Sequence, residues 1–258
     1  MTVNILAVTD QIDQRIYSPT LRQRMPDVDL VISCGDLPAR YLEFLADALD
    51  RPVYYVLGNH AEELTRGGDK GKRYYPLGCI DLGGKVVRDT ATGLIFAGIP
   101  GSPKYNDFEP VQFTEFQVMR MMWRMAPRLL LNKLRYGRAL DVLVTHAPPR
   151  DINDQPDVAH RGFKAIRRFL QKYRPRYHLH GHVHLYDRSK PHTADFVDTH
   201  IINVYPFQKL NLEFPDLADA TRPISANPAS LPSVPSVPSA TAKSPMPTAA
   251  APADPISH

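Results

Sequence analysis

Five short apolar runs in this chain are each followed by side chains that can bind a metal ion. The residues that follow the runs are, in chain order, Asp10, Asp36, Asn59 with His60, His146, and His182 with His184. The ends of neighbouring strands in open α/β sheets meet at a common edge and collect ligands there. Neutral imidazoles are the commonest metal ligands, and carboxylate and amide oxygens suit harder ions. The pattern therefore predicts a metal site at the edge of a sheet.

The apolar runs predict a chain rich in buried strands. Several of them are apolar at consecutive positions, which is typical of strands covered on both faces. The strands are expected at residues 3–9, 28–34, 52–57, 94–99, 141–145, 176–180, 200–205 and 208–213. Residues 80–99 leave no room for a helix and predict a short meander through Gly83-Gly84.

Apolar residues at helical spacing predict helices between some of these strands. The helices are expected at residues 38–49, 114–125, 127–135 and 162–173, with Pro127 separating the second from the third. Alternating strands and helices, together with a hairpin-rich portion, predict a four-layer α/β/β/α sandwich of two mixed sheets flanked by helices. We expect this domain to span residues 1–215, and the Pro-, Ala- and Ser-rich residues 216–258 to form a disordered tail.

Composition narrows the class of protein further. The net charge of +4 is mildly basic, which suits phosphate-bearing substrates without requiring nucleic acid. Cys34 and Cys79 lie in apolar surroundings and are expected to be free thiols. The sequence shows no signal peptide at its start and no long uncharged stretch, so a cytoplasmic location is expected.

The ordered motifs resemble those of the calcineurin-like metallophosphoesterase superfamily. The matching stretches are Gly35-Asp36, Gly58-Asn59-His60, Thr145-His146 and Gly181-His182-Val183-His184, in the order that the superfamily has them. Each motif alone is weak, but all of them in order, each after a strand, are strong evidence for the resemblance. It covers roughly residues 3–205.

The resemblance implies a site with two divalent metal ions. Asp36 would bridge the ions, while Asn59, His146 and His182 would complete one of them, and Asp10 and His184 would serve the other. His60 would lie over the substrate phosphate as the catalytic histidine. Two ions about 3.5–4 Å apart can hold a bridging hydroxide for in-line attack on phosphorus. Manganese is favoured over iron, magnesium and zinc.

Three departures from the superfamily pattern bear on the activity. Ile12 stands where the superfamily has a histidine ligand, so the first metal site lacks one protein ligand and is expected to be weak; Gln11, Asp13 or a water is left to replace it. Ala39 stands where the phosphoprotein phosphatase branch has an acid that orients the catalytic histidine, although Arg40 remains as a candidate phosphate contact. An acid is also common in the position of Ala61. These changes favour a compact bacterial-type member.

Two further segments allow two interpretations each. His160 and Arg161 precede a predicted helix, whose N-terminus could bind a substrate phosphate or be an ordinary helix start. Residues 118–134 carry methionines, leucines and Trp123 interleaved with arginines. Packing against the core or another subunit is favoured for this stretch over contact with a membrane or partner. Residues 105–114 could form a loop over the site.

The predicted function is a metal-dependent phosphoesterase, more a phosphodiesterase than a monoesterase, acting on a phosphate-ester small molecule or nucleotide. The alternative is a catalytically weak metal- and nucleotide-binding or scaffolding protein, which rests on Ile12. A DNA nuclease is less favoured, since the sequence predicts no extended basic aromatic surface. The sequence leaves the substrate and the oligomeric state open.

Overall fold

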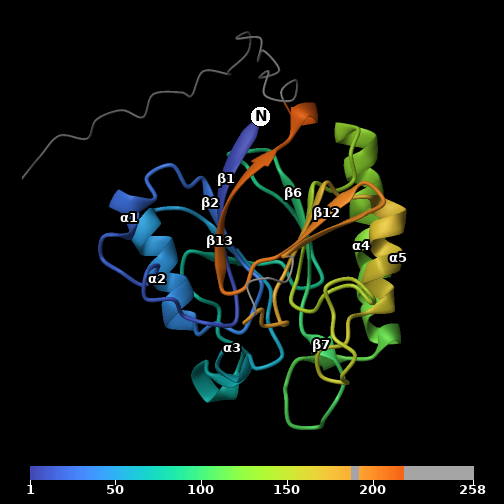
Figure 1. The fold of residues 1–258 in the computed structure, drawn as a ribbon, viewed down its shortest axis with the longest axis horizontal. Helices are drawn as coiled ribbons and strands as arrows, with labels where there is room; N and C mark the ends of the chain where they lie inside the picture. Colours follow the sequence, from blue (N-terminus) through green and yellow to red (C-terminus); the bar gives the residue numbers. More distant parts are fainter. Residues whose placement is uncertain (187–191, 218–258) are drawn as a thin grey trace, which may run out of the picture. The chain divides into compact units, whose positions relative to one another are not determined.

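The first of two large sheets carries the N-terminal strand in its interior (Figure 1). The computed structural model describes residues 1–186 and 192–217, which belong to one compact unit, Met1–Arg222. Across the sheet the strands are β13 (Phe207–Glu213), β1 (Thr2–Val8), β2 (Leu30–Ser33), β3 (Val53–Tyr55) and β4 (Cys79–Asp81). Strands β1 to β4 are parallel and β13 is antiparallel to β1, so the sheet is mixed.

The second sheet is also mixed. Across it the strands are β11 (Thr193–Phe196), β12 (Thr199–Asn203), β10 (Tyr177–His180), β9 (Val142–Thr145), β6 (Ile95–Ile99) and β5 (Val86–Arg88). The four central strands are parallel, and the two edge strands are antiparallel to their neighbours. A short parallel pair, β7 (Ser102–Pro103) and β8 (Gln112–Phe113), lies outside both sheets.

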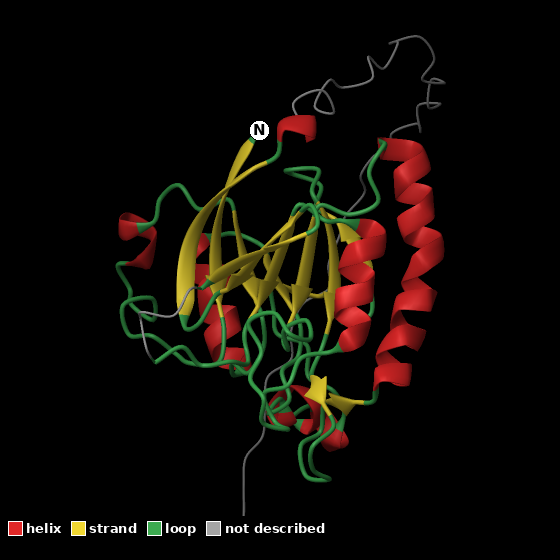
Figure 2. Cartoon of the chain, turned by 45° about the vertical axis from the view of Figure 1, so that its right-hand side comes forward, coloured by secondary structure: helices red, strands yellow, loops and turns green. Residues whose placement is uncertain are grey.

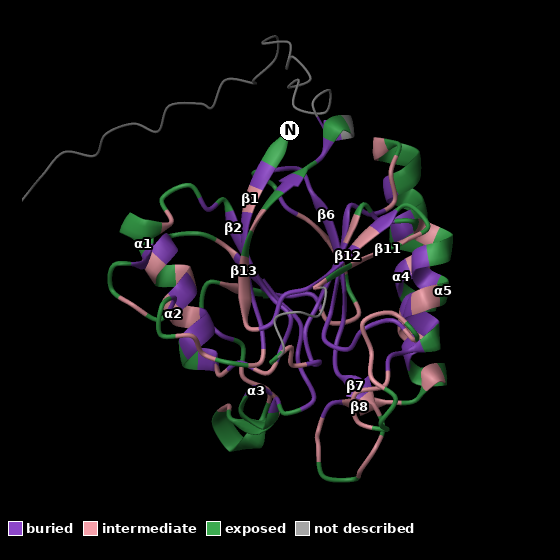
Figure 3. Cartoon of the chain, viewed as in Figure 1, coloured by how far each residue is buried: buried purple, intermediate pink, exposed green. Residues whose placement is uncertain are grey.

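Alternating side chains of the strands separate three apolar layers. In β1, Val3 and Ile5 pack into the cluster between the two sheets, whereas Leu6 and Val8 pack beneath the helices of the first sheet. Phe96 of β6 belongs to the cluster between the sheets as well. Because successive strand residues point to opposite faces, each central strand is buried on both sides (Figure 3). The predicted sandwich of two mixed sheets flanked by helices is confirmed.

Helices cover the outer faces of both sheets (Figures 1 and 2). The helices are α1 (Leu21–Arg24), α2 (Ala39–Leu49), α3 (Glu62–Arg66), α4 (Glu115–Tyr136) and α5 (Lys164–Tyr173), with short 3₁₀ turns at Asp69–Gly71 and Pro215–Leu217. Helix α2 packs on the first sheet, and α4 with α5 packs on the second. None of the helices in the described part of the chain is both long and apolar enough to cross a bilayer.

The predicted break at Pro127 is wrong, because the two predicted helices, 114–125 and 127–135, form the single helix α4, with Thr114 as its N-cap. Proline removes one backbone hydrogen bond from a helix and crowds the preceding turn. Met125 and Leu129, on either side of Pro127, are both buried in the cluster under α4 and α5. Packing across the proline therefore holds the helix continuous.

Two other predicted segments differ from the structure. Helix α5 begins at Lys164 and not at residue 162, because Phe163 is still extended: its amide donates to Pro148 O at 3.1 Å and its carbonyl accepts from Arg150 at 3.1 Å. Residues 80–99 are not one meander, since β4 belongs to the first sheet and β5 with β6 to the second. The predicted tail 216–258 lies, apart from residues 216 and 217, outside the described residues.

Candidate metal centre

The predicted ligands follow strands of both sheets, and the loops that carry them gather at one end of the molecule (Figure 2). Asp10 follows β1 and Asp36 follows β2, both in the left-handed region with φ of 58° and 56°. Residues 59 and 60 follow β3, His146 follows β9, and residues 182 and 184 follow β10. Parallel pairing brings residues 10, 36, 59 and 60 to one edge of the first sheet, and residues 146, 182 and 184 to one edge of the second. Packing of one sheet on the other brings the two edges together.

Glycines leave the space that the two carboxylates occupy. A Cβ atom on Gly58 would lie 2.0 Å from Asp36 Oδ1, and one on Gly181 would lie 2.0 Å from Thr9 Oγ1 and 2.6 Å from Asp10 Oδ2. Those distances are far shorter than any van der Waals contact, so larger residues would displace the acids. The glycines of both motifs are therefore required by packing around the site.

Asp10, Asp36 and His146 form a cluster of metal-binding groups, each offering one ligand atom within 4.8 Å of the others. His146 is fully buried; its Nε2 lies 3.2 Å from Asp36 Oδ2 and 2.8 Å from Asn59 Oδ1, while Nδ1 lies 2.8 Å from the carbonyl oxygen of Cys34. The side chains of Asp10 and Asp36 are only 3% and 8% exposed. Two buried carboxylates beside imidazole nitrogen are a donor set that fits a divalent cation.

The charge of these groups favours a cation at this position. Burial alone would raise the pKa of the Asp10 carboxyl, but His184, the charge of His146, the Thr9 hydroxyl and the His182 amide lower it to about 2. Burial alone would lower the pKa of His146, but Asp36 and Asp10 raise it to about 9. The field of the two carboxylates that favours a protonated ring equally favours a metal ion.

His182 lies beside this cluster and is nearly buried. Its ring centroid is 4.8 Å from that of His146 and 5.3 Å from that of His160, and its Nε2 lies 2.7 Å from the carbonyl oxygen of Ala159. Burial and the charge of His146 lower the pKa of His182 to about 3. A neutral ring whose Nε2 is bonded to a carbonyl leaves its other nitrogen as an acceptor.

His184 is the more exposed histidine of the last motif. Its Nε2 lies 3.4 Å from Asp10 Oδ1, and its Nδ1 lies 2.9 Å from the Tyr186 hydroxyl. The ring stacks on Tyr205 with centroids 4.5 Å apart and an interplanar angle of 16°. These contacts hold the His184 ring beside Asp10.

None of the three residues around position 12 points a free ligand atom at the cluster. Ile12 packs against the apolar cluster under α2. Both oxygens of Asp13 accept from the Arg15 guanidinium, at 2.9 and 2.7 Å, and Gln11 Oε1 accepts from the Tyr205 hydroxyl at 2.8 Å. Residues 11–13 therefore add no ligand atom to Asp10 and His184.

The loop between β7 and β8 contacts the Gly-Asn-His motif. Tyr105 hydroxyl accepts from Asn59 Nδ2 at 3.0 Å, and Glu109 Oε2 lies 2.9 Å from His60 Nδ1. Gln112 Oε1 accepts a hydrogen bond from the Tyr105 amide at 2.7 Å, which ties the two sides of the loop together. The sequence predicted a loop over the site here but did not identify Glu109, which lies far from His60 in the chain and belongs to no motif.

A hollow of about 340 Å³ opens over the cluster. It is lined by Asp10, Asp36, Asn59, His60, Tyr105, Ala159, His160, His182 and His184. Arg40 is exposed and is not part of this lining, and the Arg161 guanidinium donates to Pro156 O at 3.0 Å. Of the three predicted substrate-binding residues, the structure brings His160 to the hollow.

The first two amides of α5 are not free to bind a substrate phosphate. The amides of Lys164 and Ala165 each donate to a carboxylate oxygen of Glu115 at 2.8 Å. The helix start after His160 and Arg161 is thus an ordinary one, bonded to the beginning of α4.

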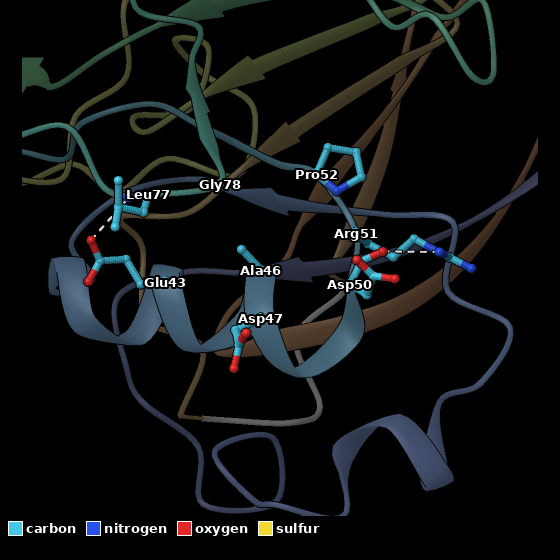
Figure 4. A pocket seen from close by; sticks show the side chains of 8 residues that line it. All are labelled: Glu43, Ala46, Asp47, Asp50, Arg51, Pro52, Leu77 and Gly78. Atoms are coloured by element: carbon cyan, nitrogen blue, oxygen red, sulfur yellow. Dashed lines mark hydrogen bonds between the residues drawn. The ribbon is translucent and has the colours of Figure 1, made fainter. Parts of the chain in front are cut away.

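A larger hollow of about 630 Å³ lies elsewhere, along the C-terminal half of α2 (Figure 4). Two of its polar side chains have partners: Glu43 accepts from the Leu77 amide at 3.0 Å, and Arg51 donates to Asp50 O at 3.0 Å. It contains none of the strand-end ligands. Size alone therefore does not make it a competing site.

The two-sheet sandwich and the strand-end cluster of carboxylates and imidazoles define a metal-binding α/β protein. The chain belongs to the calcineurin-like phosphoesterase family, whose model matches residues 3–186. Membership makes the protein a metal-dependent phosphoesterase in general terms, with divalent metal ions as the cofactor and a phosphate ester as the substrate.

Similarity to solved structures concerns the fold. One crystal structure shares 13% identity with a TM-score of 0.54 and covers 79% of this chain and 91% of that chain. TT1561 of Thermus thermophilus shares 12% identity with a TM-score of 0.49, over 79% and 89%. Vacuolar Protein Sorting 29 from Cryptosporidium parvum shares 10% identity with a TM-score of 0.38, over 79% and 74%. No curated protein sequence matches the chain.

Proposed function

We propose that this protein is a phosphodiesterase that uses two divalent metal ions. The observation that carries the proposal is the charge of the hollow: its described lining residues include two carboxylates and four histidines but neither lysine nor arginine. A phosphate monoester carries about 1.5 to 2 negative charges near pH 7, whereas a diester carries one. A site without cationic side chains is better matched to the singly charged diester.

Each residue of the site has a proposed role. Asp36 would bridge the two ions, with Asn59, His146 and His182 holding one of them and Asp10 and His184 holding the other; contacts of His146 with Asp36 and Asn59, and of His184 with Asp10, support these roles. Bound divalent ions supply Lewis-acid polarisation of the phosphoryl oxygens and lower the pKa of the attacking water. His60 faces the hollow and donates a proton to the leaving oxygen.

Glu109 supports the proposed role of His60. The 2.9 Å contact of its carboxylate with Nδ1 leaves Nε2 of the ring for the substrate. In the phosphoprotein phosphatase branch an acid in the position of Ala39 orients the catalytic histidine. Here Glu109, from the loop between β7 and β8, orients His60 instead. Its negative charge also disfavours a dianionic monoester, by roughly 1.4 kcal/mol for an added charge several Å away.

The test compares hydrolysis of bis(p-nitrophenyl) phosphate with that of p-nitrophenyl phosphate, with manganese, nickel, iron, cobalt or magnesium added in turn. We expect kcat/KM to favour the diester by about tenfold or more. A preference for the monoester, or no turnover of either ester with any of these metals, would contradict the proposal.

A second candidate function rests on the geometry around position 12. Because Ile12 and Asp13 both point to other partners, the ligand set of His184 and Asp10 is incomplete. A protein that keeps one ion and binds a nucleotide without cleaving it is the alternative. Metal analysis of the purified chain separates the two: two ions per chain with turnover support the enzyme, and one ion without turnover supports the binder.

A further inference from the structure

Helix α4 exposes a row of large apolar side chains to solvent. Phe116, Trp123 and Leu130 follow one another at seven-residue intervals and Leu134 comes four residues later, so they lie along one side of the helix. They are 59%, 60%, 59% and 77% exposed. The opposite side of α4, which includes Val118 and Leu129, is buried against the second sheet. The exposed row is therefore additional to the face that the fold needs.

The same row continues into an apolar hollow between α4 and α5. This hollow of about 130 Å³ is lined by Met119, Met122, Trp123, Ala165, Arg168, Phe169, Lys172 and Tyr173. Phe116 and Trp123 contact each other edge to face with centroids 6.1 Å apart. The exposed apolar row thus lies on α4, parts of which are exposed in Figure 3, and Trp123 joins it to the hollow beside α5.

Helices α4 and α5 carry many cations and almost no acids around this apolar area. Helix α4 contains five arginines and lysines and one acid, Glu115, and α5 contains four and no acid. The carboxylate of Glu115 is bonded to the start of α5. Of the nine cations, the described residues pair one with a carboxylate, Arg167 with Asp151. Arg120, Arg124 and Arg128 follow at four-residue intervals beside the apolar row.

We propose that the α4–α5 face, defined by the apolar row and the cations around it, docks on an anionic lipid surface. The cations match anionic headgroups, and aromatic and leucine side chains can enter the interface below them. Helix α4 has 22 residues and is about 33 Å long, so its exposed row can lie along a flat, deformable surface. This proposal is independent of the proposed activity.

Two other occupants fit the face less well. A second copy of the chain would bring two rows of Arg120, Arg124 and Arg128 together, and like charges repel. Nucleic acid would match the cations, but its surface offers nothing to Leu130 and Leu134 comparable to acyl chains. The lipid surface satisfies both the charges and the aliphatic side chains.

Trp123 is the single tryptophan of the chain and lies on the α4–α5 face, so it reports directly on docking. The test mixes the full chain with vesicles of phosphatidylcholine alone or with an equal part of phosphatidylglycerol. We expect sedimentation with the anionic vesicles and a blue shift of Trp123 emission, both weakened by salt. The triple variant R120E/R124E/R128E should bind at least about tenfold more weakly.

The control is K70E/K72E, which reverses the charge of two exposed lysines beyond α3 and should bind as the unchanged chain does. Circular dichroism and thermal unfolding check that each variant is folded. Absence of both sedimentation and blue shift with anionic vesicles overturns the proposal. So does equal binding of the triple and control variants, or a blue shift that follows protein concentration or added DNA in place of lipid.

Discussion

Replacing Glu109 with glutamine removes a charge while keeping the length and shape of the side chain. The bond links the His60 ring, which is 61% exposed, with the Glu109 carboxylate, which is 22% exposed. A charged hydrogen bond is worth about 1.5–3 kcal/mol when sheltered, and solvent reduces this, so about 1–2 kcal/mol is a reasonable loss here. If the bond acts in the transition state, kcat falls by about 5- to 30-fold.

The assay uses aryl diesters with good and poor leaving groups. A ring that donates a proton to the leaving oxygen matters more when that oxygen is basic, so E109Q should lose more activity on the poorer leaving group. KM should change little. Nitrogen-15 NMR of the His60 ring should show a tautomer fixed in the unchanged protein and mixed in the variant.

The control is E62Q, which removes an exposed acid two residues from His60 whose Arg66 partner is 4.0 Å away. Its kcat should stay unchanged. If E109Q raises KM and leaves kcat intact, Glu109 acts in substrate binding. If the loss is the same for good and poor leaving groups, its carboxylate does not act through the proton donated by His60, and the reasoning above is refuted.

Three other substitutions test the site and the core. D36N should abolish metal-induced stabilisation in a thermal shift assay and lower turnover by more than about 100-fold. The control D13N should do neither, because Asp13 pairs with Arg15. G58A places a Cβ 2.0 Å from Asp36 Oδ1 and should lower metal occupancy, measured by elemental analysis, with a loss of about 1–3 kcal/mol in unfolding free energy. Burial would raise the pKa of Asp89, but hydrogen bonds from Thr92 and Tyr54 lower it overall. The stability that Asp89 contributes is therefore present above the ordinary aspartate pKa and is lost as the pH falls through the lowered pKa. In denaturant titrations at acid pH, the free energy of unfolding should depend less on pH in D89N than in the unchanged protein. An unchanged pH dependence would contradict this.

Strand ends could be predicted from the sequence because their rule is local. An apolar run marks a buried strand, and parallel pairing brings Asp10 and Asp36 to one edge of the first sheet. His146 follows a strand of the second sheet and meets them because the two sheets pack on each other. Pro127 shows the limit of the same local rules. The proline predicts a break, but burial of its neighbours on both sides outweighs one lost hydrogen bond.

Glu109 could not be identified in this way. It lies in a loop without periodicity, and its contact with His60 depends on how Asn106 and Gln112 fold that loop back on itself. The available signal was indirect, namely a polar and aromatic segment directly after a buried strand. Long-range pairing of an acid with a histidine requires the tertiary structure.

The gap at position 12 also has a structural reason. Residue 11 is the first beyond the sharp turn at Asp10, and its side chain turns to Tyr205, while Ile12 joins the apolar residues under α2. The Tyr205 ring that holds Gln11 also stacks on His184. One aromatic residue therefore fixes both the remaining histidine and the segment that lacks a ligand. Buried contacts with Asp36, Asn59 and Cys34 hold His146 in place, whereas His184 depends on its stack on Tyr205. We therefore expect lower metal affinity at the site of His184.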